Sequence, residues 1–287
     1  MGRRWNGMDK HEALRTIAAE ASRGELVFPT SLEVGFRIQQ MLDDPDCQID
    51  AAARVIQAEP LLSARLIAVA NSAAFNSSGR SIADVRMAVN RLGLRTVRAL
   101  STAVIARQLA GKPALPVHRE LAAQLWEHTA HVGALANVIA RHLTHQDPET
   151  AMFAGMVHEV GGFYLLSRAK DFPCLMDRDV TDWMVEGQGE GEVEISRAVL
   201  AALAVPEPAV AAIEALWEGY LSFPAVTLGD TLLLAEHLAP VKSPLHHMEQ
   251  PDSVAADIDM SIEEDTLAGI LRESADEVRS LTAALRF

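Results

Sequence analysis

Apolar residues recur every three or four positions along most of the chain, the spacing of one buried face on an amphipathic helix. Val, Ile, Thr and aromatic residues nowhere alternate with polar residues over a convincing strand. Prolines at first turns and glycines between segments punctuate the pattern. The predicted helices cover about residues 9–23, 32–42, 49–58, 60–71, a segment ending at 92, 94–109, 117–145, 148–167, 194–203, 206–220, 224–238 and 262–285. The pattern therefore predicts an all-α fold.

A short linker with one glycine and two prolines, Ala110–Pro116, is the best candidate for a division of the chain. It separates a front helical lobe, about residues 1–112, from a rear helical lobe, about residues 113–287. Segments 187–192 and 242–259 are predicted to be exposed loops. We therefore expect a two-lobed helical bundle.

Composition narrows the class of protein. Of the 287 residues 49% are apolar, but every apolar run is shorter than the roughly 18 residues needed to cross a bilayer. The N-terminus has basic residues without the apolar core of a signal peptide. Cys47 and Cys174 lie far from each other in the sequence and far from any histidine, so no disulfide framework or zinc knuckle is indicated. We expect a cytoplasmic protein without membrane contact.

The net charge of −14 argues against nucleic-acid binding by the chain as a whole. The charge is unevenly distributed. Up to residue 115 there are 15 basic and 11 acidic side chains, a net charge of +4, and beyond it there are 10 basic and 28 acidic side chains, a net charge of −18. This asymmetry fits two lobes with different surfaces.

Two histidines, His128 and His131, are three residues apart in one predicted helix. They share a helix face, where two imidazoles can bind one metal ion. The alternative is structural, with His128 hydrogen-bonded between helices and His131 at the surface.

The pair His158-Glu159 lies in an apolar segment beside Gly155, Gly161 and Gly162. Small residues around a polar pair indicate that another helix or a ligand approaches the backbone there. A histidine followed directly by a carboxylate can give a divalent cation one nitrogen and one oxygen ligand.

A second carboxylate candidate lies further along the chain, at Glu236 or, six residues earlier, at Asp230. Either residue could complete a mixed nitrogen and oxygen shell of the kind that suits iron, manganese or zinc.

In this order and on helices, His128, His158-Glu159 and Glu236 resemble the metal-ligand positions of the HD phosphohydrolase superfamily, whose motif is His…His-Asp…Asp. The front of the chain narrows the resemblance. The segments that carry it are Phe28–Val34, Leu42–Pro45, Glu59–Leu66, Val69–Phe75 and Ala88–Leu94. Over about residues 26–240 the chain is similar to the HDOD domain, the HD-related output domain of bacterial signalling proteins.

The resemblance implies a regulatory signal-transduction module rather than an enzyme, because HDOD domains are regarded as relatives that lack a complete HD ligand set. Glutamate stands at both ligand-aspartate positions, Glu159 and Glu236. The extra methylene shifts each carboxylate, in a kind of site that tolerates errors of only about 0.2 Å. Where active HD-GYP relatives carry further histidines, this chain has Ser196 and Leu216-Trp217. Neither can hold a second metal ion.

These expectations fix the partners and cofactors that the sequence predicts. The partner is another signalling protein, and no cofactor is expected; a retained iron, manganese or zinc ion at the degenerate ligand set is the alternative. Two other functions stay open. One is a divergent metal-dependent phosphohydrolase acting on a nucleotide or cyclic dinucleotide, and the other is a regulator that binds a nucleotide, another small molecule or nucleic acid.

Arg91, Arg95 and Arg98 share one face of a predicted helix. Gly93 could place Arg95 near a helix N-terminus, where backbone N–H groups favour anions. The three arginines could line an anion or nucleotide pocket between the lobes, or they could pair with carboxylates of the acidic rear lobe. Asn71, at a predicted helix end, is expected to be structural, either satisfying helix-end carbonyls or adopting a left-handed turn.

Overall fold

The computed structural model describes residues 9–29, 32–111, 116–176, 190–222, 224–245 and 264–286. All regular elements within these ranges are helical, which confirms the predicted all-α fold. The earlier helices are α1 (Lys10–Ser22), α2 (Glu33–Leu42), α3 (Ile49–Ile56), α4 (Pro60–Asn71) and α5 (Val85–Leu109). The later ones are α6 (Pro116–Ile139), η2 (Ala140–Thr144), α7 (Pro148–Val157), α8 (Val160–Arg168), η3 (Pro173–Met176), α9 (Glu190–Ala202), α10 (Glu207–Glu218), α11 (Leu228–Leu238), α13 (Glu264–Glu273) and α14 (Ala275–Leu285).

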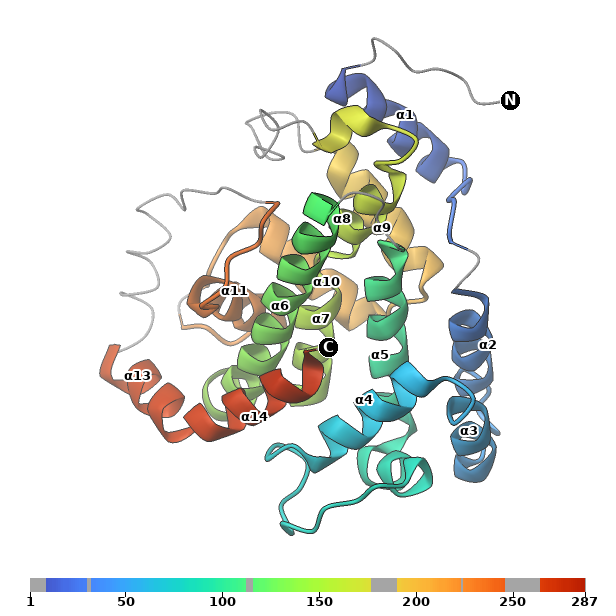
Figure 1. Cartoon of the computed structure of the whole chain (residues 1–287). Helices are drawn as coiled ribbons and strands as arrows, with labels where there is room; N and C mark the ends of the chain where they lie inside the picture. Colours follow the sequence, from blue (N-terminus) through green and yellow to red (C-terminus); the bar gives the residue numbers. More distant parts are fainter. Residues whose placement is uncertain are drawn as a thin grey trace.

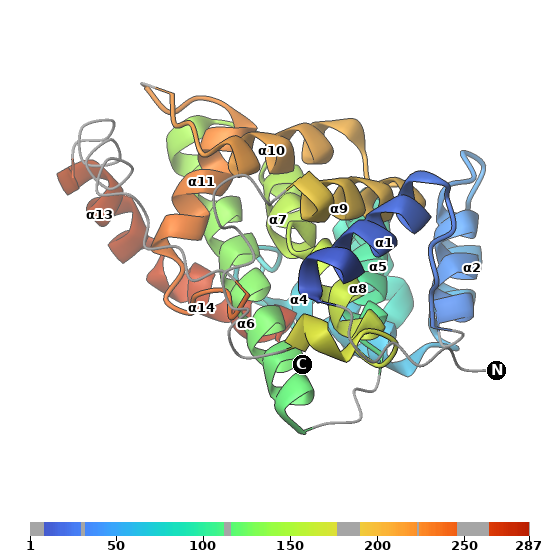
Figure 2. The same cartoon turned by 90° about the horizontal axis from the view of Figure 1, so that it is seen from above.

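Helices α2, α3 and α4 pack on α5, whereas α7 and α11 pack on α6, and α10 packs on α7 and α11 (Figure 1). Helix α5 also contacts α7 and α8, so it lies on the seam between the two groups. Helix α1 packs against α9 in the rear group, although it precedes every front helix in the sequence (Figure 2). The predicted division at residues 112 and 113 lies outside the described residues and stays a prediction.

Two of the predicted helices are interrupted. The segment 148–167 was predicted as one helix, but α7 ends at Val157 and α8 begins at Val160, with His158 and Glu159 in a turn between them. The segment 262–285 is broken at Ser274. The predicted separation at Gly93 is a kink inside α5, where φ is 77°. Glycine adopts this left-handed conformation without a Cβ penalty.

The two predicted exposed loops are only partly confirmed where the structure describes them: residues 242–245 form a loop and Lys242 is exposed, but the other described positions differ from the prediction. Glu190 already begins α9, and Glu192 is buried. Ser243 and Leu245 are buried too, because the chain after α11 folds back over α8 and Leu245 reaches Gly162. Residues 187–189 and 246–259 of these loops lie outside the described residues.

Helices α6 and α7 approach each other through two glycines. A Cβ on Gly155 would lie 2.8 Å from Cα of Gly133, closer than such atoms come in proteins. This confirms the prediction that another element approaches the backbone beside the His158-Glu159 pair. The close packing brings the α7–α8 turn against the middle of α6. Among the described helices none is both long and apolar enough to cross a membrane.

Candidate functional site

Three of the predicted ligand residues converge in the rear lobe. His128 comes from α6, His158 from the α7–α8 turn and Glu236 from α11, and their ligand atoms all lie within 4.8 Å of one another. The two Nε2 atoms are 3.2 Å apart. Oε2 of Glu236 lies 3.1 Å from Nε2 of His128 and 3.2 Å from Nε2 of His158. We call these three residues the His-His-Glu cluster.

The backbone fixes the orientation of both imidazoles. Nδ1 of His128 donates a hydrogen bond to the carbonyl of Val241, and Nδ1 of His158 donates to the carbonyl of Gly155, each at 2.8 Å. A carbonyl oxygen only accepts hydrogen bonds, so Nδ1 carries the proton in both rings. In the neutral rings both Nε2 lone pairs therefore point into the cluster, which is the usual state of histidine ligands to metals.

The cluster is largely buried, and its burial and internal contacts shift the pKa values of its members. His128 is completely buried and His158 nearly so. The Glu236 side chain is 23% exposed, but its Oε2 atom is buried and has no hydrogen bond of acceptable geometry. Burial raises the pKa of Glu236 and lowers the pKa of His128, yet their mutual contacts and the His158 contact outweigh burial. The pKa of Glu236 consequently lies far below its ordinary value and the pKa of His128 is raised.

A divalent cation fits these three donors. Ligands held about 2.1 Å from a metal ion stand about 3.0 to 3.4 Å apart in octahedral or tetrahedral shells. The three distances within the cluster, 3.1 to 3.2 Å, fall in that interval. The buried Oε2 of Glu236 lacks a hydrogen-bond donor, and a metal ion would supply the positive charge that this oxygen faces. Two imidazoles and a carboxylate suit iron, manganese or zinc.

Two other residues of the predicted set do not join the cluster. Glu159 is buried and its carboxylate lies beside Gly162, where a Cβ would stand 3.5 Å from Oε2. Its charge still contributes to the raised pKa of His128. His131 donates from Nδ1 to the carbonyl of Glu127 in its own helix, at 2.9 Å. Nε2 of His128 faces His158 and Glu236 instead, so the hypothesis that His128 and His131 share one metal ion is wrong.

Asp230, the other carboxylate candidate on α11, is occupied elsewhere. Its oxygens accept hydrogen bonds from the backbone N–H groups of Ser222, Val226 and Thr227 at 2.8 to 3.0 Å. The Ser222 and Thr227 hydroxyls also donate to it, and with Thr227 it forms a capping box at the start of α11. Asp230 therefore stabilises the α10–α11 loop, and Glu236 is the carboxylate of the cluster.

Arg95 joins α5 to the start of α7. Its guanidinium makes two hydrogen bonds to Asp147, at 2.9 and 3.1 Å, and lies 3.3 Å from Glu149. Both carboxylates stand at the start of α7, and Thr96 next to Arg95 donates a hydrogen bond to Glu149 as well. Arg95 thus pairs with carboxylates from the acidic part of the chain after residue 115, which was one of its two expected uses.

Arg91 and Asn71 hold the loop between α4 and α5. The Arg91 guanidinium donates to the carbonyls of Ala70 and Arg80, both at 2.9 Å. The Asn71 side chain donates to the carbonyl of Ile82 and accepts from its N–H, at 2.7 and 2.8 Å. Asn71 has the structural role expected of it, but its partner is the far end of the loop instead of the end of its own helix.

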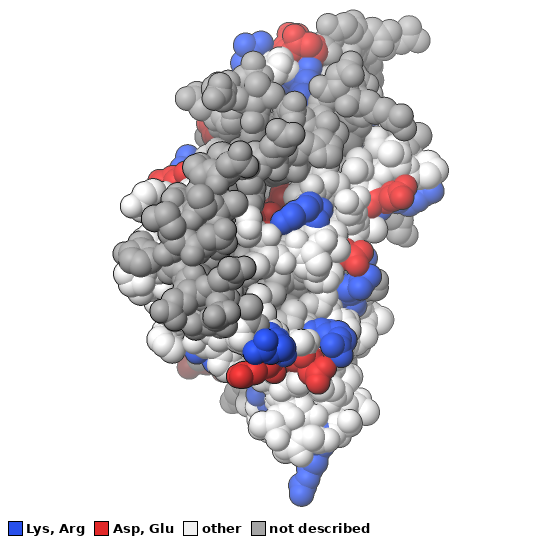
Figure 3. All heavy atoms as spheres, turned by 90° about the vertical axis from the view of Figure 1, so that its left-hand side faces the viewer, with Lys and Arg blue, Asp and Glu red and all other residues white. Residues whose placement is uncertain are grey.

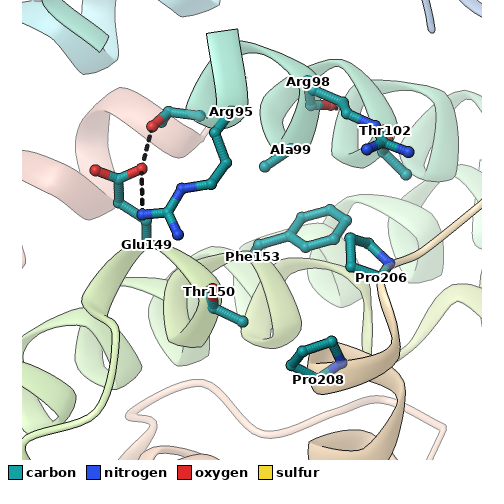
Figure 4. Close-up of a pocket in the computed structure, with 10 residues that line it drawn as sticks. Arg95, Arg98, Ala99, Thr102, Glu149, Thr150, Phe153, Pro206 and Pro208 are labelled. Atoms are coloured by element: carbon teal, nitrogen blue, oxygen red, sulfur yellow. Dashed lines mark hydrogen bonds and ion pairs between the residues drawn. The ribbon is translucent and has the colours of Figure 1, made fainter. Parts of the chain in front are cut away.

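A cavity of about 230 Å³ lies on the seam between the lobes (Figure 4). Its lining comes from α5, α7 and the start of α10: Arg95, Thr96, Arg98, Ala99, Thr102, Glu149, Thr150, Phe153, Pro206 and Pro208. The sequence pointed to its two arginines but not to its apolar floor. The signal that could have found the floor is the Pro206-Glu207-Pro208 sequence, because prolines at a helix start leave apolar rings there, and Pro206 is the N-cap of α10.

The face of the molecule shown in Figure 3 mixes charges of both signs. Most of its basic side chains lie next to acidic ones, and the described residues form no broad basic surface there. An electrostatic footprint for nucleic acid would be such a surface.

A family model of the HDOD domain matches residues 28–215. Solved structures share the fold. A protein from Shewanella amazonensis SB2B, named as a proposed metal-dependent phosphohydrolase, has a TM-score of 0.73 at 22% identity, covering 96% of this chain and 98% of its own. An HDOD domain protein of unknown function from Geobacter sulfurreducens has a TM-score of 0.61 at 23% identity, with 96% and 98% covered. A protein from Marinobacter aquaeolei VT8, named as a proposed signal transduction protein, has a TM-score of 0.59 at 18% identity, with 97% and 67% covered.

No curated protein matches the chain. The family match agrees with the predicted span of about residues 26–240, but it stops before α11 and therefore before Glu236. Because their identities are below 25%, these solved structures show only that the fold is shared.

Proposed function

The chain belongs to the HDOD family, and we propose that it is a regulatory signal-transduction module without hydrolase activity, acting through a partner protein or a small ligand. The observation that carries the proposal is the state of the His-His-Glu cluster. Within the described residues it is a single group of three ligands, and Glu159, at the other ligand-aspartate position of the HD motif, is not one of them.

A hydrolytic metal centre needs a ligand position open to water and a path for the substrate. Here both imidazoles are buried, the carbonyl of Val241 lies against His128, and Leu245 packs over Gly162 beside Glu159. These contacts favour a closed site. Ser196, where a second metal would need a ligand, is buried against Gly161.

His128, His158 and Glu236 would hold one divalent iron, manganese or zinc ion. When bound, this ion would supply a positive charge that neutralises Glu236 and cross-links α6, the α7–α8 turn and α11. The chain's own part is to orient both Nε2 atoms through the carbonyls of Val241 and Gly155. We propose that this site stabilises the rear lobe so that its surfaces keep one arrangement for the partner.

The experiment measures metal content and turnover on the same purified chain. Iron, manganese and zinc are quantified, and hydrolysis of a cyclic dinucleotide and of nucleoside phosphates is assayed with each ion added. We expect at most one ion per chain and no turnover. His158→Ala should lose the metal, while the matched control His131→Ala should keep it.

The divergent phosphohydrolase is the competing function, and convergence of two imidazoles with a carboxylate is the observation in its favour. Turnover that His158→Ala abolishes and His131→Ala leaves intact would establish it and refute our proposal. Nucleic-acid binding has weaker support, because Arg91 and Arg95 already bind carbonyls and carboxylates. If it occurs, affinity for single-stranded and duplex probes should fall steeply with added salt.

A further inference from the structure

The inter-lobe cavity is placed where a bound molecule would touch both lobes at once. One wall is α5 of the front lobe, and the other walls are α7 and the first residues of α10. Gln39 of α2 reinforces this seam by donating hydrogen bonds to Thr102 of α5, at 3.4 Å, and to the carbonyl of Leu203 after α9. A ligand here would therefore act on the contact between the lobes.

The two ends of the cavity differ chemically. Figure 4 shows Arg95 with Glu149 at one end and the guanidinium of Arg98 beside Thr102 at the other, with Phe153 between them. Arg95 is occupied by its carboxylate partners. Glu149, the acidic side chain of the lining at that end, is likewise paired, with Arg95 and Thr96. An anionic group of a ligand would therefore be recognised at the other end.

The Arg98 guanidinium has N–H donors that are not used within the described residues. Its guanidinium contacts Asp43 through Nε at 2.6 Å and makes no other ion pair or hydrogen bond among the described residues. The two Nη groups therefore remain available to a ligand. A guanidinium presents paired N–H groups that match a carboxylate or phosphate.

The floor of the cavity suits a flat ring. Phe153 lies between the two ends, Pro206 lies on its Arg98 side, and Ala99 contributes only a small side chain on the α5 side (Figure 4). Aromatic rings gain energy from offset stacking on a phenyl ring beyond the area that they bury. An apolar cavity of about 150 Å³ holds benzene. At about 230 Å³ this one has room for a single ring with a small acidic substituent.

We propose that the inter-lobe cavity binds a single-ring aromatic acid, with its ring on Phe153 and its carboxylate or phosphate on Arg98. The proposal deepens the proposed function, because it gives the regulatory module a small-molecule input, and only that regulatory role rests on the proposed function. Binding would stabilise the contact between α5 and α7 in proportion to ligand occupancy.

The test uses the full chain and two probes, benzoate and phenyl phosphate, followed by calorimetry and by two-dimensional NMR. Each probe should bind with a dissociation constant of about 1 mM, the affinity expected of so small a ligand. The two probes separate a carboxylate source from a phosphate source. Benzyl alcohol and benzylamine are the neutral and cationic controls, and both should bind at least about tenfold more weakly, because they cannot use the Arg98 Nη groups.

Three variants locate the site. Arg98→Gln should weaken both probes about tenfold or more, since charged hydrogen bonds are lost. Ala99→Leu should abolish binding by filling the space above Phe153 while leaving the charges in place. Arg86→Gln is the matched control: Arg86 also lies on α5 and also contacts an aspartate, Asp50, through Nε, but it is not in the cavity lining.

Absence of binding at 20-fold the expected constant, equal binding of benzylamine and benzoate, or unchanged affinity in Ala99→Leu would each overturn the proposal. A variant that unfolds is recognised by its melting curve, and the other variant then decides. Hydrolase turnover at the His-His-Glu cluster would refute the proposed function and leave the cavity result standing, because the probes report binding alone.

Discussion

The His-His-Glu cluster and the inter-lobe cavity both gather charged side chains, but in opposite ways. In the cluster the charged atoms point inward, are buried, and come from α6, the α7–α8 turn and α11 of one lobe. In the cavity the charged groups stand at the ends, are partly exposed, and have an apolar floor between them. The residues that line the cavity come from α5 on one side and from α7 and the start of α10 on the other.

This difference separates a site that holds structure from one that responds to ligand. Removing one partner of a buried, mutually dependent group leaves an uncompensated charge, which is costly. Removing an exposed ion pair costs little, because water replaces the partner. Damage to the cluster should therefore appear in stability, whereas damage to the cavity should appear in binding with the fold preserved.

The largest effect is expected from His128→Ala. This change leaves the Glu236 carboxylate with one imidazole and creates a buried space, so the free energy of unfolding should fall by about 3 kcal/mol. Chemical denaturation monitored by circular dichroism measures it. His131→Ala, on the same helix but bonded to its own backbone, should cost less than about 1 kcal/mol. Equal losses in the two variants would remove the distinction between the cluster and an ordinary polar pair.

The second effect tests the packing that positions the cluster. In Gly155→Ala the new methyl group would meet the Gly133 backbone at 2.8 Å, so α7 must move away from α6. Overpacking of this kind costs about 1 to 3 kcal/mol. Metal affinity should fall together with stability, because His128 and His158 separate. Gly269→Ala, in α13 with nothing within 4 Å of the added Cβ, should be neutral or stabilising.

Much of the architecture follows from local rules that the sequence displays. The 3.6-residue periodicity predicted an all-helical chain, and Pro60, at the first turn of α4, begins that helix as predicted. Gly93 marked the kink in α5 because only glycine tolerates its positive φ readily. The interruption at His158-Glu159 was missed, since apolar residues on both sides continue the helical pattern and the break is stabilised by tertiary contacts.

The sequence predicted the residues that could form the candidate site, but not which of two carboxylates would join it. Glu236 and Asp230 lie on one helix, and sequence alone left both as possible ligands. What decides between them is the α10–α11 loop, which wraps its backbone N–H groups around Asp230. The backbone carbonyl that orients His128 belongs to Val241, which is 113 residues away in the sequence. Such long-range partners leave no local pattern.

A smaller effect is expected at Asp230, the carboxylate that forms the capping box at the start of α11 and does not join the His-His-Glu cluster. Burial raises the pKa of Asp230, but hydrogen bonds from Ser222 and Thr227 outweigh it and hold the pKa below its ordinary value. A lowered pKa means that the ionised form stabilises the fold above the ordinary aspartate range, about pH 4, and that this contribution is lost as the pH falls. Asp230→Asn should cost about 1 to 2 kcal/mol at pH 7.

The pH profile distinguishes Asp230 from a plain surface aspartate. The difference in stability between the wild type and Asp230→Asn should shrink as the pH falls below about 4 and disappear below the folded-state pKa. Asp84→Asn is the control, because Asp84 is an exposed cap that accepts one hydrogen bond, from the Met87 N–H. A difference that stays constant down to pH 2 would show that the charge of Asp230 is irrelevant.

The smallest effect is expected at the seam. Arg95 binds Asp147 in a two-pronged pair, but the Arg95 side chain is 67% exposed, so Arg95→Ala should cost at most about 1 kcal/mol and less at high salt. Arg86→Ala breaks a comparable exposed pair inside the front lobe and should match that small loss. Only Arg95→Ala should increase hydrogen exchange at the start of α7, because only Arg95 crosses the seam. If both variants leave exchange in α7 unchanged, the lobes are held together by apolar packing of α5 on α7 and α8, and the charge asymmetry of the chain has no part in joining them.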